Sequence, residues 1–196
     1  MDVIPSENLP PSAMPWGKNM TQWRRDIGFR FERNEQDVGN NLAQLNASVQ
    51  LLSRQVAALP VPIVQSQNNT NWGINGVAGF STKASVQIVI PAGKTNVQIQ
   101  VTGGVAMLDT TSGGLAVGSA RIVINNISSP VFQASKDAAA SAVNNIITPS
   151  FGISFNGLTP GGTITVNLDC QATNPSAYPT SSTNYASLTV LAIFTP

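Results

Sequence analysis

The chain has 196 residues and a formal net charge of +1, with no histidine and a single cysteine. Its charged residues gather in residues 1–59, and the other 137 residues carry only seven. A segment with so few cations lacks the basic surface that sequence-independent nucleic-acid binding requires, which excludes a nucleic-acid partner. The N-terminal residues lack the apolar segment that a secretory signal peptide contains, and no apolar run is long enough to span a membrane. We therefore expect a protein made in a cytoplasm, without membrane insertion.

Residues 1–18 are predicted to form an extended arm, because their four prolines fix φ and remove backbone donors. The arm is rich in apolar side chains for a disordered tail, so we interpret it as a segment that docks into a groove on another protein. A flexible terminus whose apolar residues make no contact is the alternative. The candidate docking residues, including one tryptophan just beyond the arm, are Ile4, Pro5, Leu9, Pro10, Pro11, Met14, Pro15, Trp16 and Trp23.

A helix is predicted from Asn19 onward, as the entry to a stalk over residues 19–59. Trp23, Ile27 and Phe31 follow one another at spacings of four residues and share one helical face. Gly28 lowers helix propensity by about 1 kcal/mol relative to alanine. We therefore expect a short or frayed entry helix, bent near this glycine.

The stalk itself shows apolar residues at alternating spacings of four and three, which is the period of a coiled coil. One helix cannot bury such a stripe by itself, and the uncharged e and g positions favour association with identical copies. Valine at a with leucine at d leans toward a parallel dimer, but Leu42 at an a position weakens that preference. The candidate oligomerisation residues are Phe31, Val38, Leu42, Leu45, Val49, Leu52, Val56 and Leu59.

Residues 60–79 are predicted to be a linker and entry segment. Pro60 and Pro62 stop the helix and form a stiff extended joint. Residues 64–71, with the sequence VQSQNNTN, are polar throughout and are expected to be solvated.

Residues 80–196 read as an antiparallel β-sandwich head of the jelly-roll type, with short alternating runs separated by turn residues. For residues 136–143, a single helical turn is an alternative to a strand. The nearly continuous apolar run at the end of the chain predicts a central strand or a buried subunit contact. The expected strands cover residues 85–90, 97–101, 105–108, 116–124, 130–134, 142–148, 152–155, 163–169 and 185–194.

The sequence contains no catalytic constellation. Without histidine, the Ser-His and Cys-His nucleophile systems and histidine metal sites are absent, so we expect no enzyme, no metal and no cofactor. The head has only three acidic residues, Asp109, Asp137 and Asp169, in different predicted strands or loops. Cys170 lies in an alternating apolar run and is predicted to be a buried, unreactive thiol.

The polar loop of residues 174–185 places Tyr178 among small, amide and hydroxyl side chains. An aromatic ring with such neighbours stacks on sugars, which makes Tyr178, Asn174 and Asn184 candidates for a host-surface glycan contact. The alternative is that Tyr178 only holds the loop in place.

The run IPSENLPPSAMPWGKNMTQWRRDI, residues 4–27, combines PSENLPP with a following PW ahead of the coiled coil. Because of these motifs, the first third of the chain resembles minor tail proteins of tailed bacteriophages that infect actinobacteria. The resemblance implies a homotrimeric minor tail or small tail-fibre protein, made in the host cytoplasm and fixed to the tail tip or baseplate by about residues 1–35. A capsid-anchored decoration protein or head fibre with the same plan is the alternative.

Overall fold

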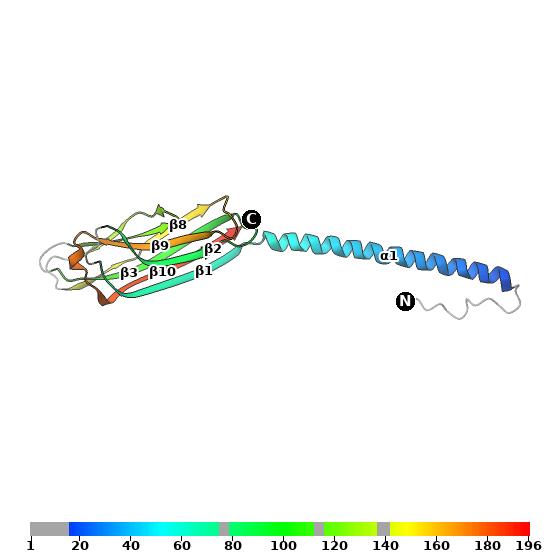
Figure 1. Ribbon diagram of the computed structural model, residues 1–196, viewed down its shortest axis with the longest axis horizontal. Helices are drawn as coiled ribbons and strands as arrows, with labels where there is room; N and C mark the ends of the chain where they lie inside the picture. Colours follow the sequence, from blue (N-terminus) through cyan, green and yellow to red (C-terminus); the bar gives the residue numbers. More distant parts are fainter. Residues whose placement is uncertain (1–15, 75–78, 112–115, 137–141) are drawn as a thin grey trace. The chain divides into compact units, whose positions relative to one another are not determined.

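The computed structural model describes residues 16–74, 79–111, 116–136 and 142–196 (Figure 1). The chain divides into two compact units, Met1–Val56 and Ala57–Pro196. Most of the predicted docking residues lie outside the described residues, and so does most of the segment with a helical alternative, at residues 137–141. The docking residues outside the described part are Ile4, Pro5, Leu9, Pro10, Pro11, Met14 and Pro15.

Helix α1 (Trp16–Ala58) is one continuous element of 43 residues, roughly 65 Å long at 1.5 Å per residue. The prediction of a start at Asn19 and of an extended arm up to residue 18 is therefore wrong at its boundary. The short entry helix expected around Gly28 is also wrong: α1 continues through this glycine, which costs only about 1 kcal/mol relative to alanine. The predicted stop is confirmed, since α1 ends two residues before Pro60.

The second unit is a β head built from two antiparallel sheets, as the sequence predicted. The first sheet has the strand order β1–β10–β3–β7, with β8 also paired to β3, and the second has the order β2–β9–β4–β5, with β6 also paired to β4. The elements are β1 (Val61–Trp72), β2 (Ser81–Val89), β3 (Asn96–Asp109), β4 (Val117–Ile124), β5 (Ile127–Ser128), β6 (Phe132–Ser135), β7 (Val143–Ile147), β8 (Ser150–Phe155), β9 (Thr163–Ala172), the 3₁₀ turn η2 (Pro175–Ala177) and β10 (Ser181–Thr195).

The core lies between the two sheets and follows from strict alternation along the strands. In β10, Leu188, Val190, Ala192 and Phe194 are buried while the residues that alternate with them are more exposed. Strand β10 pairs with β1 on one side and β3 on the other. The prediction of a central last strand is thus confirmed. Cys170 in β9 is buried in the same core, and burial raises the pKa of its thiol to about 12, which leaves it uncharged and unreactive at neutral pH.

The predicted linker is wrong, because residues 61–72 form the long edge strand β1, antiparallel to β10. Its polar side chains have specific partners on β2. The Gln67 side-chain Oε1 accepts a hydrogen bond from the Ser85 backbone amide, and Asn69 Nδ2 donates to the Lys83 backbone carbonyl at 2.7 Å. The polar side chains of β1 therefore connect the edges of the two sheets. Composition alone cannot distinguish such a strand from a solvated linker.

Strand β3 unites two segments that the sequence predicted to be separate strands, 97–101 and 105–108. Gly103 and Gly104 between them continue the strand instead of turning it. The Gly103 amide donates to the Pro149 carbonyl at 2.8 Å, so the glycine pair admits a close backbone approach within the sheet.

Gly73 provides a sharp test of the packing that follows β1. A Cβ atom at this position would lie 2.5 Å from the Thr180 amide nitrogen and 2.7 Å from the Pro179 carbonyl carbon. Because backbone cannot move aside easily, Gly73→Ala is expected to destabilise the head by about 1–3 kcal/mol in urea unfolding. The control is Gly28→Ala, which has open space around its Cβ and should not destabilise the protein. An unchanged urea midpoint for Gly73→Ala would contradict this packing.

Candidate functional site

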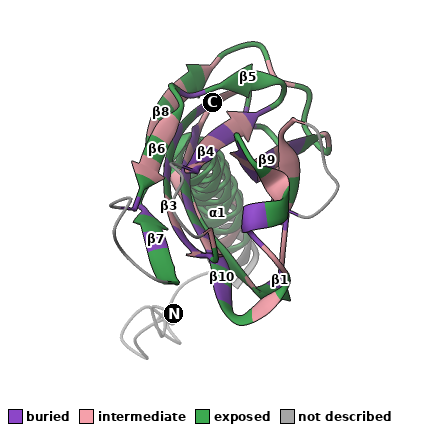
Figure 2. Cartoon of the chain, turned by 90° about the vertical axis from the view of Figure 1, so that its left-hand side faces the viewer, coloured by how far each residue is buried: buried purple, intermediate pink, exposed green. Residues whose placement is uncertain are grey.

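The apolar heptad residues of α1 remain on the surface of the chain. Figure 2 colours most of the visible part of α1 as exposed. These seven residues, hereafter the heptad stripe, are between 54% and 66% exposed. An exposed apolar stripe of this regularity is the signature of a helix that packs against other helices. The stripe consists of Val38, Leu42, Leu45, Val49, Leu52, Val56 and Leu59.

The borders of the heptad stripe are polar and uncharged. The flanking e and g positions are Asn46 and Ser53 on one side and Asn41, Ser48 and Gln55 on the other. Copies of this surface can therefore meet without like-charge repulsion, and no charge pair selects a different partner. The arrangement is compatible with self-association, which the sequence had predicted from the same residues.

The aromatic residues upstream extend the stripe only in part. Phe31 lies one heptad before Val38 and is 65% exposed, but the intervening a position is Glu35. Trp23 and Ile27 are half-buried. The apolar seam is therefore continuous only from Val38 onward.

The end of the helix has a specific cap that the sequence did not reveal. Lys94, in the turn before β3, is buried, and its Nζ donates to the carbonyls of Ala57 and Leu59 at 2.6 Å each. All three residues belong to the second unit. The last carbonyls of a helix have no intrahelical partner. This cation satisfies that of Ala57 in the last turn and that of Leu59 just beyond the helix, and it complements the negative end of the helix dipole.

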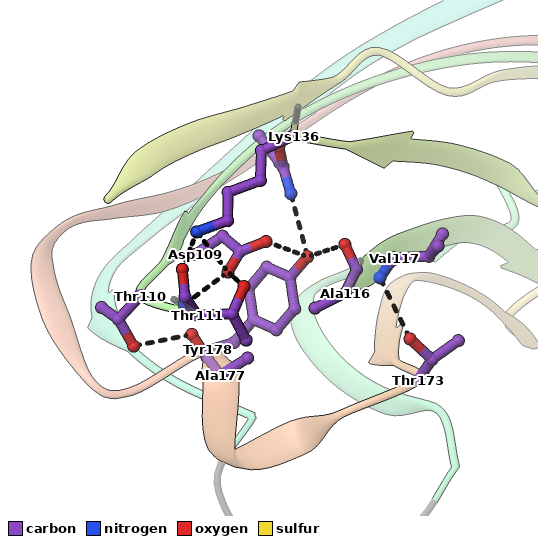
Figure 3. Close-up of polar contacts among 10 residues, drawn as sticks. Asp109, Thr110, Thr111, Ala116, Val117, Lys136, Thr173, Ala177 and Tyr178 are labelled. Atoms are coloured by element: carbon purple, nitrogen blue, oxygen red, sulfur yellow. Dashed lines mark hydrogen bonds and ion pairs between the residues drawn. The ribbon is translucent and has the colours of Figure 1, made fainter. Parts of the chain in front are cut away.

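A buried polar cluster occupies the region where β3, β7 and η2 come together, and Figure 3 shows the Tyr178 ring at its centre. Tyr178 is fully buried. Its hydroxyl accepts a hydrogen bond from Asn145 Nδ2 at 2.9 Å and lies 3.1 Å from the Ala116 carbonyl and 3.3 Å from Asp109 Oδ2, to either of which it can donate. A buried tyrosine hydroxyl with partners on several segments holds those segments together.

Asp109 is the charged member of this cluster. Its Oδ1 accepts from the Thr111 amide at 2.9 Å and hydroxyl at 2.6 Å, and lies 3.7 Å from Lys136 Nζ, with both charged side chains inaccessible to solvent. Burial raises the pKa of Asp109, but the Thr111 hydrogen bonds and the Lys136 charge outweigh it, so the pKa lies below its usual value. Burial and the Asp109 charge raise the pKa of Tyr178, which stays a neutral donor.

These contacts overturn the predicted glycan contact at two of its three residues. Tyr178 and Asn184 are both buried. Asn184 Nδ2 donates to the Trp72 and Pro179 carbonyls, and its Oδ1 accepts from the Leu108 amide. Only Asn174 is exposed, with its Oδ1 accepting from Ser176 Oγ at 2.7 Å. Tyr178 thus holds the loop in place, as the alternative interpretation had it.

Asp169, the other acidic residue of the described head, is also paired with a cation. Asp169 Oδ2 lies 3.5 Å from Arg121 Nη2, and its Oδ1 accepts from Thr82 Oγ1 at 2.8 Å. Asp137 lies outside the described residues. Within the part of the chain that the structure describes, no three metal-ligating side chains form a cluster. Among the same residues, no helix has the length and apolarity needed to cross a bilayer.

No protein-family model matches the chain, and no curated protein matches it. Among solved structures, the chain is similar to VP2 in a subviral particle of infectious bursal disease virus, at 16% identity and a TM-score of 0.28 over 69% of this chain and 32% of that one. It is also similar to dimeric latent PorU from Porphyromonas gingivalis, at 8% identity and a TM-score of 0.40 over 69% of this chain and 13% of that one. The chain thus spans about a third of the VP2 chain and less of PorU, and at these TM-scores neither similarity carries an argument about function.

Proposed function

We propose that the chain is a self-associating structural protein of a virus particle, in which the heptad stripe joins copies and the β head is displayed. The observation that carries the proposal is the exposed stripe on a continuous helix of 43 residues. Burying apolar surface contributes about 25 cal/mol per Å², so a stripe of seven branched side chains provides a strong drive for association.

Three chains are the proposed copy number, and the support for it is the resemblance of residues 4–27 to phage minor tail proteins. The heptads themselves leave a dimer open, since valine at a and leucine at d is the pattern of two-stranded coiled coils. Sedimentation equilibrium of the full chain distinguishes the two, and a mass of one or two chains contradicts the trimer.

The N-terminal arm is proposed to anchor the protein in the particle. Deleting residues 1–15 leaves α1 whole, because that helix begins at Trp16. The truncated protein is expected to keep the oligomeric mass and urea midpoint of the full chain, yet to be absent from purified particles on immunoblots. Full-length protein expressed at the same level is the control. Incorporation of the truncated chain at the normal level would show that docking lies elsewhere.

A tail tip or baseplate is the proposed place of attachment, again on the motifs PSENLPP and PW. Electron microscopy of particles with a gold-labelled antibody against the head gives the test. Label at the tail tip agrees with the proposal. Label over the capsid overturns it in favour of a decoration protein or head fibre.

The proposed role is structural and not catalytic. Asp109 and Asp169 each contact a cation and a hydrogen-bond donor of the chain, so both carboxylates are engaged in contacts within the head. The burial of Tyr178 also removes the residue on which a sugar contact was predicted, so the proposal includes no glycan site. Turnover of purified cell wall that disappears in Asp109→Asn or Asp169→Asn would overturn the structural assignment.

A further inference from the structure

Among the described residues, the outer face of the first sheet carries no charged side chain. In the first sheet, residues that pair across β1, β10, β3, β7 and β8 alternate between the core and the outside, and the outward set forms what we call the uncharged face. Its members are Pro62, Val64, Ser66, Asn68 and Thr70 of β1; Tyr185, Ser187, Thr189, Leu191, Ile193 and Thr195 of β10; Asn96, Gln98, Gln100, Thr102, Gly104, Ala106 and Leu108 of β3; Asn144 and Ile146 of β7; and Ser150, Gly152 and Ser154 of β8.

The charges of the head, among the described residues, lie elsewhere and each has a partner within the chain. Arg121 and Asp169 pair with each other on strands of the second sheet. Lys83, in β2, donates to the Gly73 carbonyl at 2.9 Å. The others are Lys94 at the helix end and the buried pair of Asp109 and Lys136. The two sheets of one small domain therefore present chemically different surfaces.

The uncharged face is most apolar where β1 begins. Val64, which is 67% exposed, is the register partner of Leu191, which is 36% exposed, and the next row places Pro62 opposite Ile193. A shallow hollow of about 210 Å³ adjoins this group of four residues. Uncharged residues line it throughout: Asn96, Val97, Gln98, Ser154, Asn156, Ile193 and Thr195. An exposed apolar group beside a hollow is the usual composition of an interface core.

Chain connectivity keeps this group close to the heptad stripe. Pro62 follows Leu59 by three residues, which span at most about 10 Å of extended chain. In an assembly joined at the stripe, the copies of Pro62 and Val64 are therefore held at a high effective concentration toward one another. Near a symmetry axis identical side chains approach one another, so like charges there repel, and an uncharged surface avoids that repulsion.

We propose that the uncharged face, centred on Pro62, Val64, Leu191 and Ile193, is the surface through which the heads of neighbouring copies contact one another. A second copy fits it because uncharged amides and hydroxyls pair without desolvating ions, and the hollow beside Ile193 can receive an apolar side chain. With β1 of 12 residues and four strands abreast, the face covers roughly 600 Å², near the roughly 800 Å² per partner of a standard interface. This inference rests on the proposed self-association.

The first test places a cation on each sheet of the full-length protein. Leu191→Lys lies on the uncharged face, and its matched control, Gln87→Lys, lies at an exposed position of β2 in the second sheet. In sedimentation equilibrium, Leu191→Lys is expected to raise the dissociation constant of the oligomer at least tenfold, while Gln87→Lys leaves it unchanged. Both variants should keep the urea midpoint of the head, because both positions are exposed.

The second test is independent of folding stability. Val64→Cys and Gln87→Cys each add one surface thiol, and the native Cys170 does not compete because it is buried. A short bis-maleimide should cross-link copies through Val64→Cys in high yield and through Gln87→Cys only at background. Equal yields, together with equal dissociation constants for the two lysine variants, overturn the head contact and leave the stalk intact. A wild-type chain that sediments as a monomer overturns the proposed function together with this inference.

Discussion

Replacing Leu45 and Leu52 by aspartate together is expected to convert the assembled protein into a monomer. Both residues occupy d positions of the heptad stripe, at 60% and 61% exposure in the single chain. In an assembly these side chains would face their own copies in an apolar seam, where a carboxylate costs several kcal/mol unless it is paired. Sedimentation velocity at micromolar concentration measures the loss. Circular dichroism should also show less helix, since an isolated helix is marginal in water.

The matched control for this prediction is Gln44→Asp with Leu51→Asp. These two residues are also seven apart, at c positions, and Leu51 is 58% exposed, so the control adds the same charges at the same spacing off the stripe. It should retain the oligomer. If both double variants dissociate, general charge repulsion explains the effect. If neither double variant dissociates, the copies associate through their heads, and Leu191→Lys is then expected to dissociate the oligomer.

Lys136→Met is expected to give the largest loss of stability in the head, about 3–5 kcal/mol, because it leaves the buried Asp109 carboxylate without its cation. Urea unfolding at neutral pH, followed by the signal of the head, measures the change. Arg121→Met is the comparison. It breaks an ion pair whose side chains are 31% and 11% exposed, so a smaller loss is expected.

The double variant Asp109→Asn with Lys136→Met should recover part of that stability, because the residual buried group is then neutral. The same ion pair has a signature in pH. The folded-state pKa of Asp109 lies below its unfolded value, so the pair stabilises the head above the unfolded pKa of about 4 and loses this contribution as the pH falls through the folded value. Equal stability of Lys136→Met and wild type would contradict a buried, ionised Asp109.

The predictions that proved correct were those based on local periodicity in the sequence. The spacing of the heptad residues, the stop at Pro60 and the alternation in residues 85–90 and 163–169 each depend on neighbours only a few positions away. The helix, its end and most strands of the head were therefore readable in advance. The candidate self-association surface was readable for the same reason, since the heptad stripe spans 22 residues and all of them but the last lie in one helix.

Long-range contacts explain the predictions that failed. The polar residues 64–71 form a strand because β10, more than a hundred residues away, supplies the hydrogen bonds, and because Gln67 and Asn69 reach β2. Tyr178 is buried because its hydroxyl partners Asp109 and Asn145 arrive from distant strands. A segment of small and polar residues is equally consistent with a solvated loop and with a strand or a buried loop, so its composition does not distinguish them.

The sequence by itself determined the periodic parts of this protein: a long helix with an unpaired apolar stripe, a proline stop and a β head poor in charge. Only the tertiary structure decided where the few charges of that head lie. The pairing register, set by contacts between distant strands, places Arg121 opposite Asp169 in the second sheet and buries Asp109 with Lys136. It also leaves the outer side of the first sheet without charge among the described residues, which no local pattern could reveal because the face is assembled from five separate strands.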